Sequence, residues 1–252
     1  MVVAALASGA GRKASMRRTI EVGNRSLPLI IRRTSRKKSI GVELTCRHEV
    51  IVRVPRSLGE RAIHEGVSKC LPWLRKKLAA LPPTATAPAL DTGREMLVLG
   101  EVKRLVVADG VPEVRVAARG RELTVAMPVV PEAERETTIS SALTGWYREK
   151  ATAVIGSLVA RYSAILKVPP PPFSVTHARR RWGSCSASGR LNFAWRLAMA
   201  PPALIEYVVV HELCHLKRRD HSPAFWALVA QVLPDWQERR KRLRDQGILF
   251  DL

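Results

Sequence analysis

Residues 211–221 read His-Glu-Leu-Cys-His-Leu-Lys-Arg-Arg-Asp-His, and this run constrains the fold more than any other part of the 252-residue chain. His211 and His215 are four positions apart, so on a helix both imidazoles leave the same face, at the spacing that a single metal ion needs. Glu212 points about 100° round the helix from His211, where it can reach a water molecule beside the ion. The run therefore predicts a helix that carries a metal site.

The residues before the motif predict that this helix is buried. Residues 203–210 are almost all apolar, as expected of a helix inside a small domain, and Pro201 and Pro202 mark its start. In the alternative reading, the two histidines are ordinary side chains satisfied in an apolar core. The residues on either side favour the metal site over that alternative.

The residues after the motif predict a sharp turn. Ser222 and Pro223 are typical of an N-cap and of the first position of a new helix. Asp220 tolerates an unusual backbone conformation in such a bend. The turn can bring His221 over the ion as a third ligand. Three neutral nitrogen ligands with one open position describe a catalytic zinc site rather than a closed structural one.

Three blocks of sequence occur in order along the chain. A basic block spans residues 32–40, a second block covers residues 181–186 and 189–193, and the third contains the histidine motif at residues 207–226. Together they resemble the YgjP-like metallopeptidase family, a relative of the SprT-like and WLM zinc peptidases. Metzincins also place a third histidine six residues after the second, but they carry glycine where this chain has Arg218.

The resemblance implies a zincin-type domain with zinc as its cofactor. His211, His215 and His221 would be the ligands and Glu212 the catalytic base. The second block supplies the candidate substrate-binding residues, which are Trp182, Gly183, Ser184 and Asn192.

The implied reaction is hydrolysis of a peptide bond by a zinc-activated water. Candidate donors to the substrate carbonyl are Tyr207, His177 and residues 181–184, and Leu191–Leu197 is expected to be an edge strand that binds an extended peptide. One alternative is a metal-dependent nucleoside triphosphate (UTP) pyrophosphatase, an activity also linked with the family, although no glycine-rich phosphate loop is visible. A second alternative is a DNA-associated, SprT-like protease.

Charge is concentrated in the first third of the chain. The chain carries a net charge of +20, and residues 1–85 hold 18 basic against 5 acidic side chains. A nucleic acid, a nucleotide or an acidic protein are the candidate partners of this region. The alternative is a solvated basic surface, because no aromatic residues are interleaved with the basic ones as in single-strand binders.

Hydropathy and cysteine usage predict a cytoplasmic protein that has no membrane partner. No run of about 18 apolar residues is present, so no segment is expected to span a bilayer. The apolar stretch at residues 1–10 lacks a preceding basic residue and is expected to belong to a flexible tail over residues 1–16. The four cysteines form no CxxC pair, which suits a reducing compartment.

The remaining pattern predicts an α+β fold. Alternating apolar residues at 19–22, 27–33, 39–44 and 49–54 predict an antiparallel meander. A helix is expected from a capping box at Ser57–Glu60 to about Leu81, kinked or restarted at Pro72. Residues 82–88 form a proline-rich connector.

Four further strands are expected at residues 95–99, 102–107, 114–117 and 122–127, and helical spacing runs from 132 to 166. Strands at 173–178 and 190–198 precede the zinc helix and final helices at 223–233 and 235–246. We therefore expect a strand-rich, basic region over residues 17–130 and a zincin-like metallopeptidase domain over residues 131–252.

Overall fold

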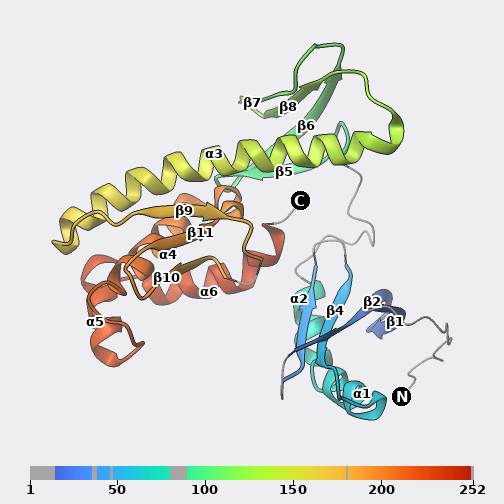
Figure 1. The fold of residues 1–252 in the computed structure, drawn as a ribbon, viewed down its shortest axis with the longest axis horizontal. Coiled ribbons are helices and arrows are strands. Elements are labelled where there is room, and N and C mark those ends of the chain that lie inside the picture. The colour runs from blue at the N-terminus through green and yellow to red at the C-terminus, as the bar shows by residue number, and fades with distance from the viewer. Residues whose placement is uncertain (1–14, 36–38, 46–47, 80–89, 180, 251–252) are drawn as a thin grey trace. The chain divides into compact units, whose positions relative to one another are not determined.

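The computed structural model describes residues 15–35, 39–45, 48–79, 90–179 and 181–250 (Figure 1). The contacts divide the chain into two compact units, residues 1–87 and 88–250. The proline-rich connector and residues 1–14 of the expected tail lie outside the described residues, while Ser15 and Met16 begin the first strand. The expected division into regions 17–130 and 131–252 stays a prediction.

The first unit is a four-stranded sheet followed by two helices. Its elements are β1 (Ser15–Val22), β2 (Arg25–Thr34), β3 (Gly41–Leu44), β4 (Val50–Pro55), α1 (Glu60–Ser68) and α2 (Leu71–Ala79). The strand order is β1-β2-β4-β3, and β2 runs parallel to β4. The expected meander is therefore wrong. β4 is buried at nearly every position and occupies the centre, whereas the short, half-buried β3 forms an edge.

The expected capping box is also wrong, although the helix and its interruption are confirmed. α1 has Gly59 as its N-cap and no side-chain cap. The Leu58 amide bonds the Pro55 carbonyl in a turn, and the Glu60 carboxylate accepts a hydrogen bond from Arg18 at 2.6 Å instead of reaching back to the helix start. The helix then restarts as α2 just before Pro72.

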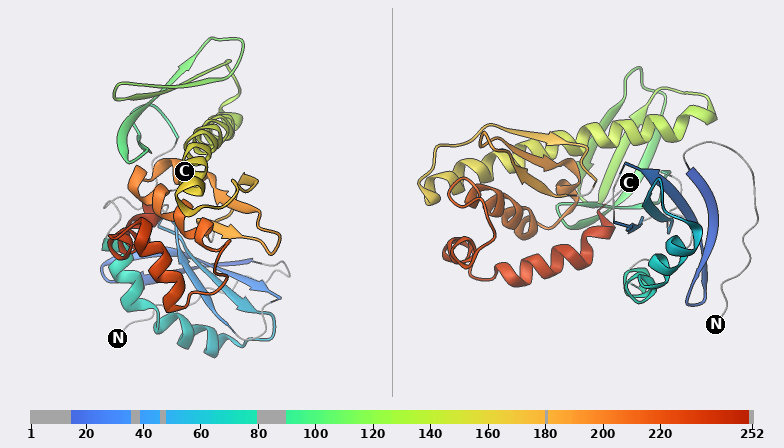
Figure 2. Two further views of the ribbon diagram at one scale, coloured as in Figure 1. Left: turned by 90° about the vertical axis from the view of Figure 1, so that its left-hand side faces the viewer. Right: turned by 60° about the horizontal axis from the view of Figure 1, so that its bottom comes forward.

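The second unit begins with another four-stranded sheet. Its strands are β5 (Glu95–Val98), β6 (Glu101–Asp109), β7 (Arg115–Arg119) and β8 (Glu122–Met127), in the order β5-β6-β8-β7. The helix α3 (Glu132–Leu166) follows as one uninterrupted element, visible in both views of Figure 2. It ends where Lys167 adopts a left-handed conformation (φ 53°) and the Val168 amide bonds the Ser163 carbonyl, just before the prolines at 169–172.

The rest of the second unit is a small sheet and the helices beside it. The elements are β9 (Phe173–Thr176), β10 (Gly183–Cys185), β11 (Leu191–Ala194), η1 (Trp195–Met199), α4 (Pro202–Cys214), α5 (Pro223–Val232), α6 (Trp236–Gln246) and η2 (Gly247–Leu249). α3 packs against the sheet of β5–β8 near its start and against η1, α4 and β9 farther along. The architecture is mixed α+β, as expected.

The small sheet corrects one expectation that bears on the site. Its order is β10-β11-β9, so β11 is paired on both sides and the stretch Leu191–Leu197 is not an edge strand. Residues 195–199 form the 3-10 helix η1 instead of continuing the strand, and all five are buried. Four of these five residues are apolar and do not alternate with polar ones, so the run packs against α3 and β5.

Candidate metal centre

The helix α4 presents two of the three histidines. It begins with Pro202 in its first turn and buries apolar residues nearly all round, including Leu204, Val208 and Leu213. His211 lies in its last turn and His215 is its C-cap, with helical dihedrals (φ −66°, ψ −17°). As the sequence predicted, the four-residue spacing places both rings on one face at the end of the helix.

His221 reaches this face from a tightly bonded turn. The Arg219 guanidinium donates to the carbonyls of Ser186 (2.6 Å) and Ala187 (2.8 Å), which fixes the turn against the β10–β11 connection. Ser222 is the N-cap of α5, as expected, but its hydroxyl donates to the Asp220 carboxylate at 2.9 Å rather than capping the helix. Asp220 has no left-handed backbone conformation, so the bend does not use the freedom expected of it.

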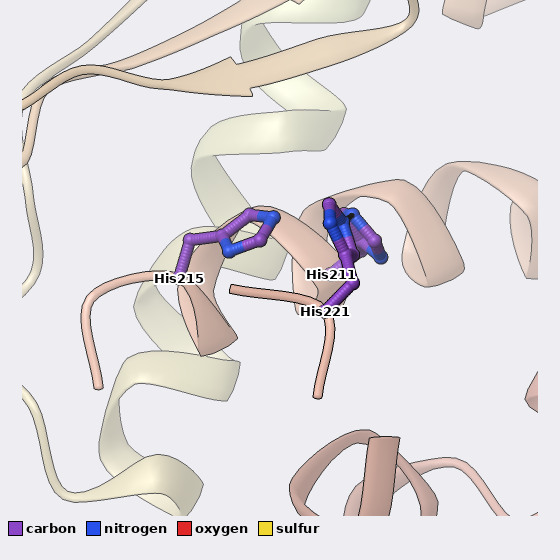
Figure 3. A group of neighbouring side chains, drawn as sticks. All are labelled: His211, His215 and His221. Carbon is purple, nitrogen blue, oxygen red and sulfur yellow. Dashed lines mark hydrogen bonds between the residues drawn. The ribbon is translucent and has the colours of Figure 1, made fainter. Parts of the chain in front are cut away.

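The three rings converge (Figure 3). One ligand atom from each of His211, His215 and His221 lies within 4.8 Å of the other two, and the Nε2 atoms of His211 and His221 are 3.1 Å apart. Two nitrogens bound tetrahedrally to zinc at 2.0–2.1 Å are separated by roughly 3.3 Å. The triad therefore fits a zinc ion after only small ring movements.

The second ring nitrogen of His215 is already engaged. Its Nδ1 lies 3.0 Å from the Arg218 carbonyl oxygen, which can only accept, so Nδ1 carries the proton and the Nε2 lone pair stays free for a metal. For His211, burial and the nearby charges of His215, His221 and Arg240 lower the pKa to about 3. The imidazole is thus neutral at cellular pH, as a metal ligand must be.

Aromatic side chains of α5 form the wall around the triad. Phe225 stacks on His215 with ring centroids 4.5 Å apart, and Trp226 lies 5.6 Å from His211 and from His221. These contacts hold the rings in place and limit the access of water from this side.

Glu212 is buried beside the triad, with only 6% of its surface exposed. Burial raises the pKa of its carboxyl to about 7, and the positive charge of Arg181 acts in the opposite direction. A carboxyl with this pKa exchanges protons near neutral pH, which a general acid–base catalyst requires.

Gly183 leaves the space that the Glu212 side chain occupies. A Cβ atom at Gly183 would lie 2.6 Å from both Cγ and Oε1 of Glu212. Any larger residue at this position would therefore have to displace the carboxylate. Gly183 was expected to bind substrate, and the structure places it directly against the Glu212 side chain.

Arg196, a residue of η1 that is 92% buried, holds the loop before Gly183 in place. Its guanidinium donates to the carbonyls of Ala178 (3.2 Å) and Arg179 (2.8 Å) and lies over the Trp182 ring at 5.2 Å. No local pattern in the sequence distinguishes Arg196 from other arginines, because its partners are backbone carbonyls brought near by the fold.

The other candidate substrate residues lie on or beside the small sheet. Ser184 and Asn192 are directly opposed in the β10–β11 pair, and both are half-buried. Trp182 packs against Phe250 with centroids 5.9 Å apart. Their contact with a substrate stays a prediction.

Of the candidate donors, Tyr207 lies near the triad and His177 lies elsewhere. The Tyr207 ring centroid is 5.9 Å from that of His211, whereas His177 packs near Trp195 at 6.4 Å. Burial raises the pKa of the Tyr207 hydroxyl to about 12, so it keeps its proton and can donate.

The described part of the chain contains no helix that is both long and apolar enough to cross a bilayer. Within it, Cys70, Cys185 and Cys214 are free thiols.

Comparisons with known proteins agree with this geometry. The model of the "YgjP-like, metallopeptidase domain" family matches residues 38–246. A UTP pyrophosphatase of Escherichia coli (strain K12) is 31% identical over 61 residues, which are 24% of this chain and 36% of that protein, so the match spans about a third of that relative.

Among solved structures, the metallopeptidase zymogen of Pyrococcus abyssi abylysin is similar over 35% of this chain and 90% of that one, with 23% identity. Its TM-score of 0.34 is too low to establish a shared fold. The family match covers most of the chain, including β10, the histidine triad and α6. The chain therefore belongs to the YgjP-like family of metallopeptidase domains.

Proposed function

We propose that this chain is a zinc-dependent metallopeptidase with a zincin-type site, in which a zinc-activated water hydrolyses peptide bonds and Glu212 is the general base. The observation that carries the proposal is the convergence of three histidine nitrogens within 4.8 Å, next to a buried carboxylate. Zinc held by His211, His215 and His221 would polarise the substrate carbonyl and lower the pKa of a water molecule to roughly 7.

The chain's own groups would handle the protons. The Glu212 carboxylate takes the proton from the attacking water and transfers it to the leaving amine, and a carboxyl pKa near neutrality suits both steps. The Tyr207 hydroxyl is our candidate donor to the substrate oxygen as charge develops there.

An extended peptide substrate would pair with β10. Because β11 is paired on both sides, β10 is the edge of the small sheet that packs against α4. An edge strand offers unpaired backbone groups to a peptide. Gly183 and Ser184 on β10 would then contact the substrate, with Asn192 and Trp182 supporting them from β11 and the preceding loop.

The assigned base is tested with Glu212→Gln. The zinc-loaded variant should lose roughly 10²- to 10⁴-fold in kcat on a casein-derived peptide, because the amide cannot accept the proton. Its zinc content, measured by elemental analysis, should match the wild type. Full activity with a full complement of zinc would discard Glu212 as the base.

The space at Gly183 is tested with Gly183→Ala and a matched control, Gly145→Ala. The first variant should bind zinc but lose activity, since the new methyl group displaces the Glu212 carboxylate. A methyl group at Gly145 on α3 meets nothing within 4 Å, so the control should stay active. Equal activities would show that Gly183 does not position the base.

UTP pyrophosphatase activity is the second candidate function, and the similarity to the Escherichia coli enzyme favours it. UTP is therefore assayed beside the peptide with the same Glu212→Gln control. Hydrolysis of UTP but not of the peptide would replace the peptidase proposal.

For the first unit we propose an anionic partner, nucleic acid or nucleotide, as in a DNA-associated, SprT-like protease. Exposed Lys69 at the end of α1 and exposed Trp73, Arg75 and Lys76 on α2 support this surface. Binding of DNA should weaken steeply with salt, and a flat response would exclude phosphate contacts. The free thiols support a reducing compartment such as the cytoplasm.

A further inference from the structure

Two adjacent arginines of α6 have opposite surroundings. Arg239 is paired: its guanidinium donates to the Glu206 carboxylate and, from Nε, to Asp235 at 2.9 Å. Arg240 is exposed, and among the described residues no carboxylate lies within salt-bridge distance of it. Its guanidinium carbon lies 4.9 Å from the centroid of the Trp226 ring.

Trp226 connects Arg240 to the metal centre. The indole is 5.6 Å from the rings of both His211 and His221, and Trp236 stacks on it at 4.2 Å. The Arg240 guanidinium and the rings of His211 and His221 thus share Trp226 as a neighbour.

A second cation lies in the loop before β10. Arg181 is exposed there, two residues before Gly183, which packs against Glu212, so positive side chains are present near the centre on both α6 and this loop. Of the acidic side chains at the site, Glu212 is buried, and Asp220 accepts a hydrogen bond from Ser222. The described surroundings of the centre thus favour a negatively charged ligand.

We propose that Arg240 binds an oxyanion of the substrate beside the metal centre, so that this site selects substrates with a carboxylate or phosphate near the bond that is cleaved. The proposal rests on the proposed hydrolytic function and names its substrate class. A guanidinium offers two parallel N–H donors to an oxyanion. Contact with Trp226 restricts the Arg240 side chain beforehand, which reduces the entropy lost on binding.

Anion binding is tested without catalysis. Isothermal titration of the zinc-loaded protein with inorganic tripolyphosphate compares wild type, Arg240→Gln and the control Arg242→Gln, which removes an equal charge from another exposed position of α6. Arg240→Gln should weaken binding about 10- to 100-fold, and Arg242→Gln less than about twofold. Equal affinities for all three would overturn the proposal, whether or not the protein is a hydrolase.

The source of the oxyanion is tested with substrates. Peptides that differ only by Glu or Gln next to the cleaved bond are compared with UTP. The wild type should prefer the Glu peptide, UTP or both, and Arg240→Gln should raise the KM for the preferred substrate with little change in kcat. A preference for Glu identifies a peptide carboxylate, and an effect on UTP alone identifies a phosphate. An unchanged preference in Arg240→Gln would contradict the proposal.

Discussion

The sheet of β1–β4 and the sheet of β5–β8 have the same design. Each has the order first, second, fourth, third, with a parallel central pair between two antiparallel edges. Their first hairpins have the same length: the closing pairs are Val22–Arg25 and Val98–Glu101. In the parallel pairs, Leu29 is opposite Val50 and Leu105 is opposite Leu123, at the same distance from each hairpin.

The side chains of the two sheets also match. The fourth strand of each buries every second residue completely, and these residues are Val50, Val52 and Val54 in β4, and Leu123, Val125 and Met127 in β8. A proline ends each pattern, and the same spacing then leads to a tryptophan on a later helix, from Pro55 to Trp73 on α2 and from Pro128 to Trp146 on α3.

The two sheets differ in what their hairpin tips contact. The amides of Leu99 and Gly100 donate to the Ala198 and Met199 carbonyls of η1 at 2.8 and 3.0 Å. A Cβ at the equivalent tip residue Gly23 would meet nothing within 4 Å. The tip of the second sheet therefore supports η1, which precedes the helix α4 that carries His211.

The largest expected effect concerns the metal centre. His215→Ala removes one of the three proposed zinc ligands, and loss of even an outer-shell partner costs roughly 10- to 100-fold in metal affinity. We expect zinc affinity to fall at least about 100-fold and hydrolysis to be lost, whereas His64→Ala on the exposed face of α1 should change neither. Zinc titration with a competing chelator measures both variants. A similar loss of zinc affinity in the two variants would contradict the assignment of the metal centre to the second unit.

Next come the two hairpin tips. Gly100 has φ +83° and a Cβ there would lie 2.8 Å from Pro201, whereas Gly23 has φ +66° and open surroundings. Gly100→Ala should cost about 3 kcal/mol of unfolding free energy or more, through strain and overlap together. Gly23→Ala should cost only about 1 to 2 kcal/mol, through strain alone. Urea unfolding, followed in each unit separately, measures the loss of unfolding free energy in both variants. Equal losses would show that the two tips do not differ.

A smaller effect is expected from Tyr147→Phe. The Tyr147 hydroxyl donates to the Leu97 carbonyl of β5 at 2.8 Å, whereas Leu74 occupies the equivalent place in the first unit. The variant leaves that carbonyl without its partner and should destabilise the second unit by about 1 to 2 kcal/mol. The measurement is the urea midpoint. No change would show that the hydroxyl adds nothing to helix–sheet packing.

The smallest effect concerns pH. The folded pKa of His211 is about 3, below its ordinary value of 6.5, so its stabilising contribution is present above pH 6.5 and is lost as the pH falls below that value. The metal-free protein should be about 1 kcal/mol less stable at pH 5.5 than at pH 7 through this group. Burial lowers the pKa of His48 in the first unit in the same direction. The unfolding free energies of His211→Asn and His48→Asn at both pH values give the contribution of each unit. A change with pH equal to that of the wild type would contradict the two pKa shifts.

Most of the helices and strands were predicted because the spacing of apolar residues in helices and their alternation in strands can be read directly from the sequence. The apolar helix before His211 and the long helical spacing from 132 to 166 are both observed as expected. The convergence of His221 was also predictable, since Ser222 and Pro223 fix where the chain must turn.

Tertiary relations were not predictable from these patterns. The central place of β4 and of β11 depends on which strands bury both faces. The residues of η1, which are apolar except for Arg196, fit a strand as well as a 3-10 helix. Likewise, the approach of Gly183 to Glu212 and of Arg240 to the triad depends on elements far apart in the sequence.

The continuity of α3 has a consequence for how activity is lost on heating. At about 1.5 Å per residue, its 35 residues extend roughly 50 Å along both the second sheet and the helix α4. Tyr162 of α3 donates to Glu206 of α4, to which Arg239 of α6 also donates. Melting of the sheet and loss of the histidine triad should therefore occur as one cooperative transition, so a partly melted state that keeps the triad does not accumulate.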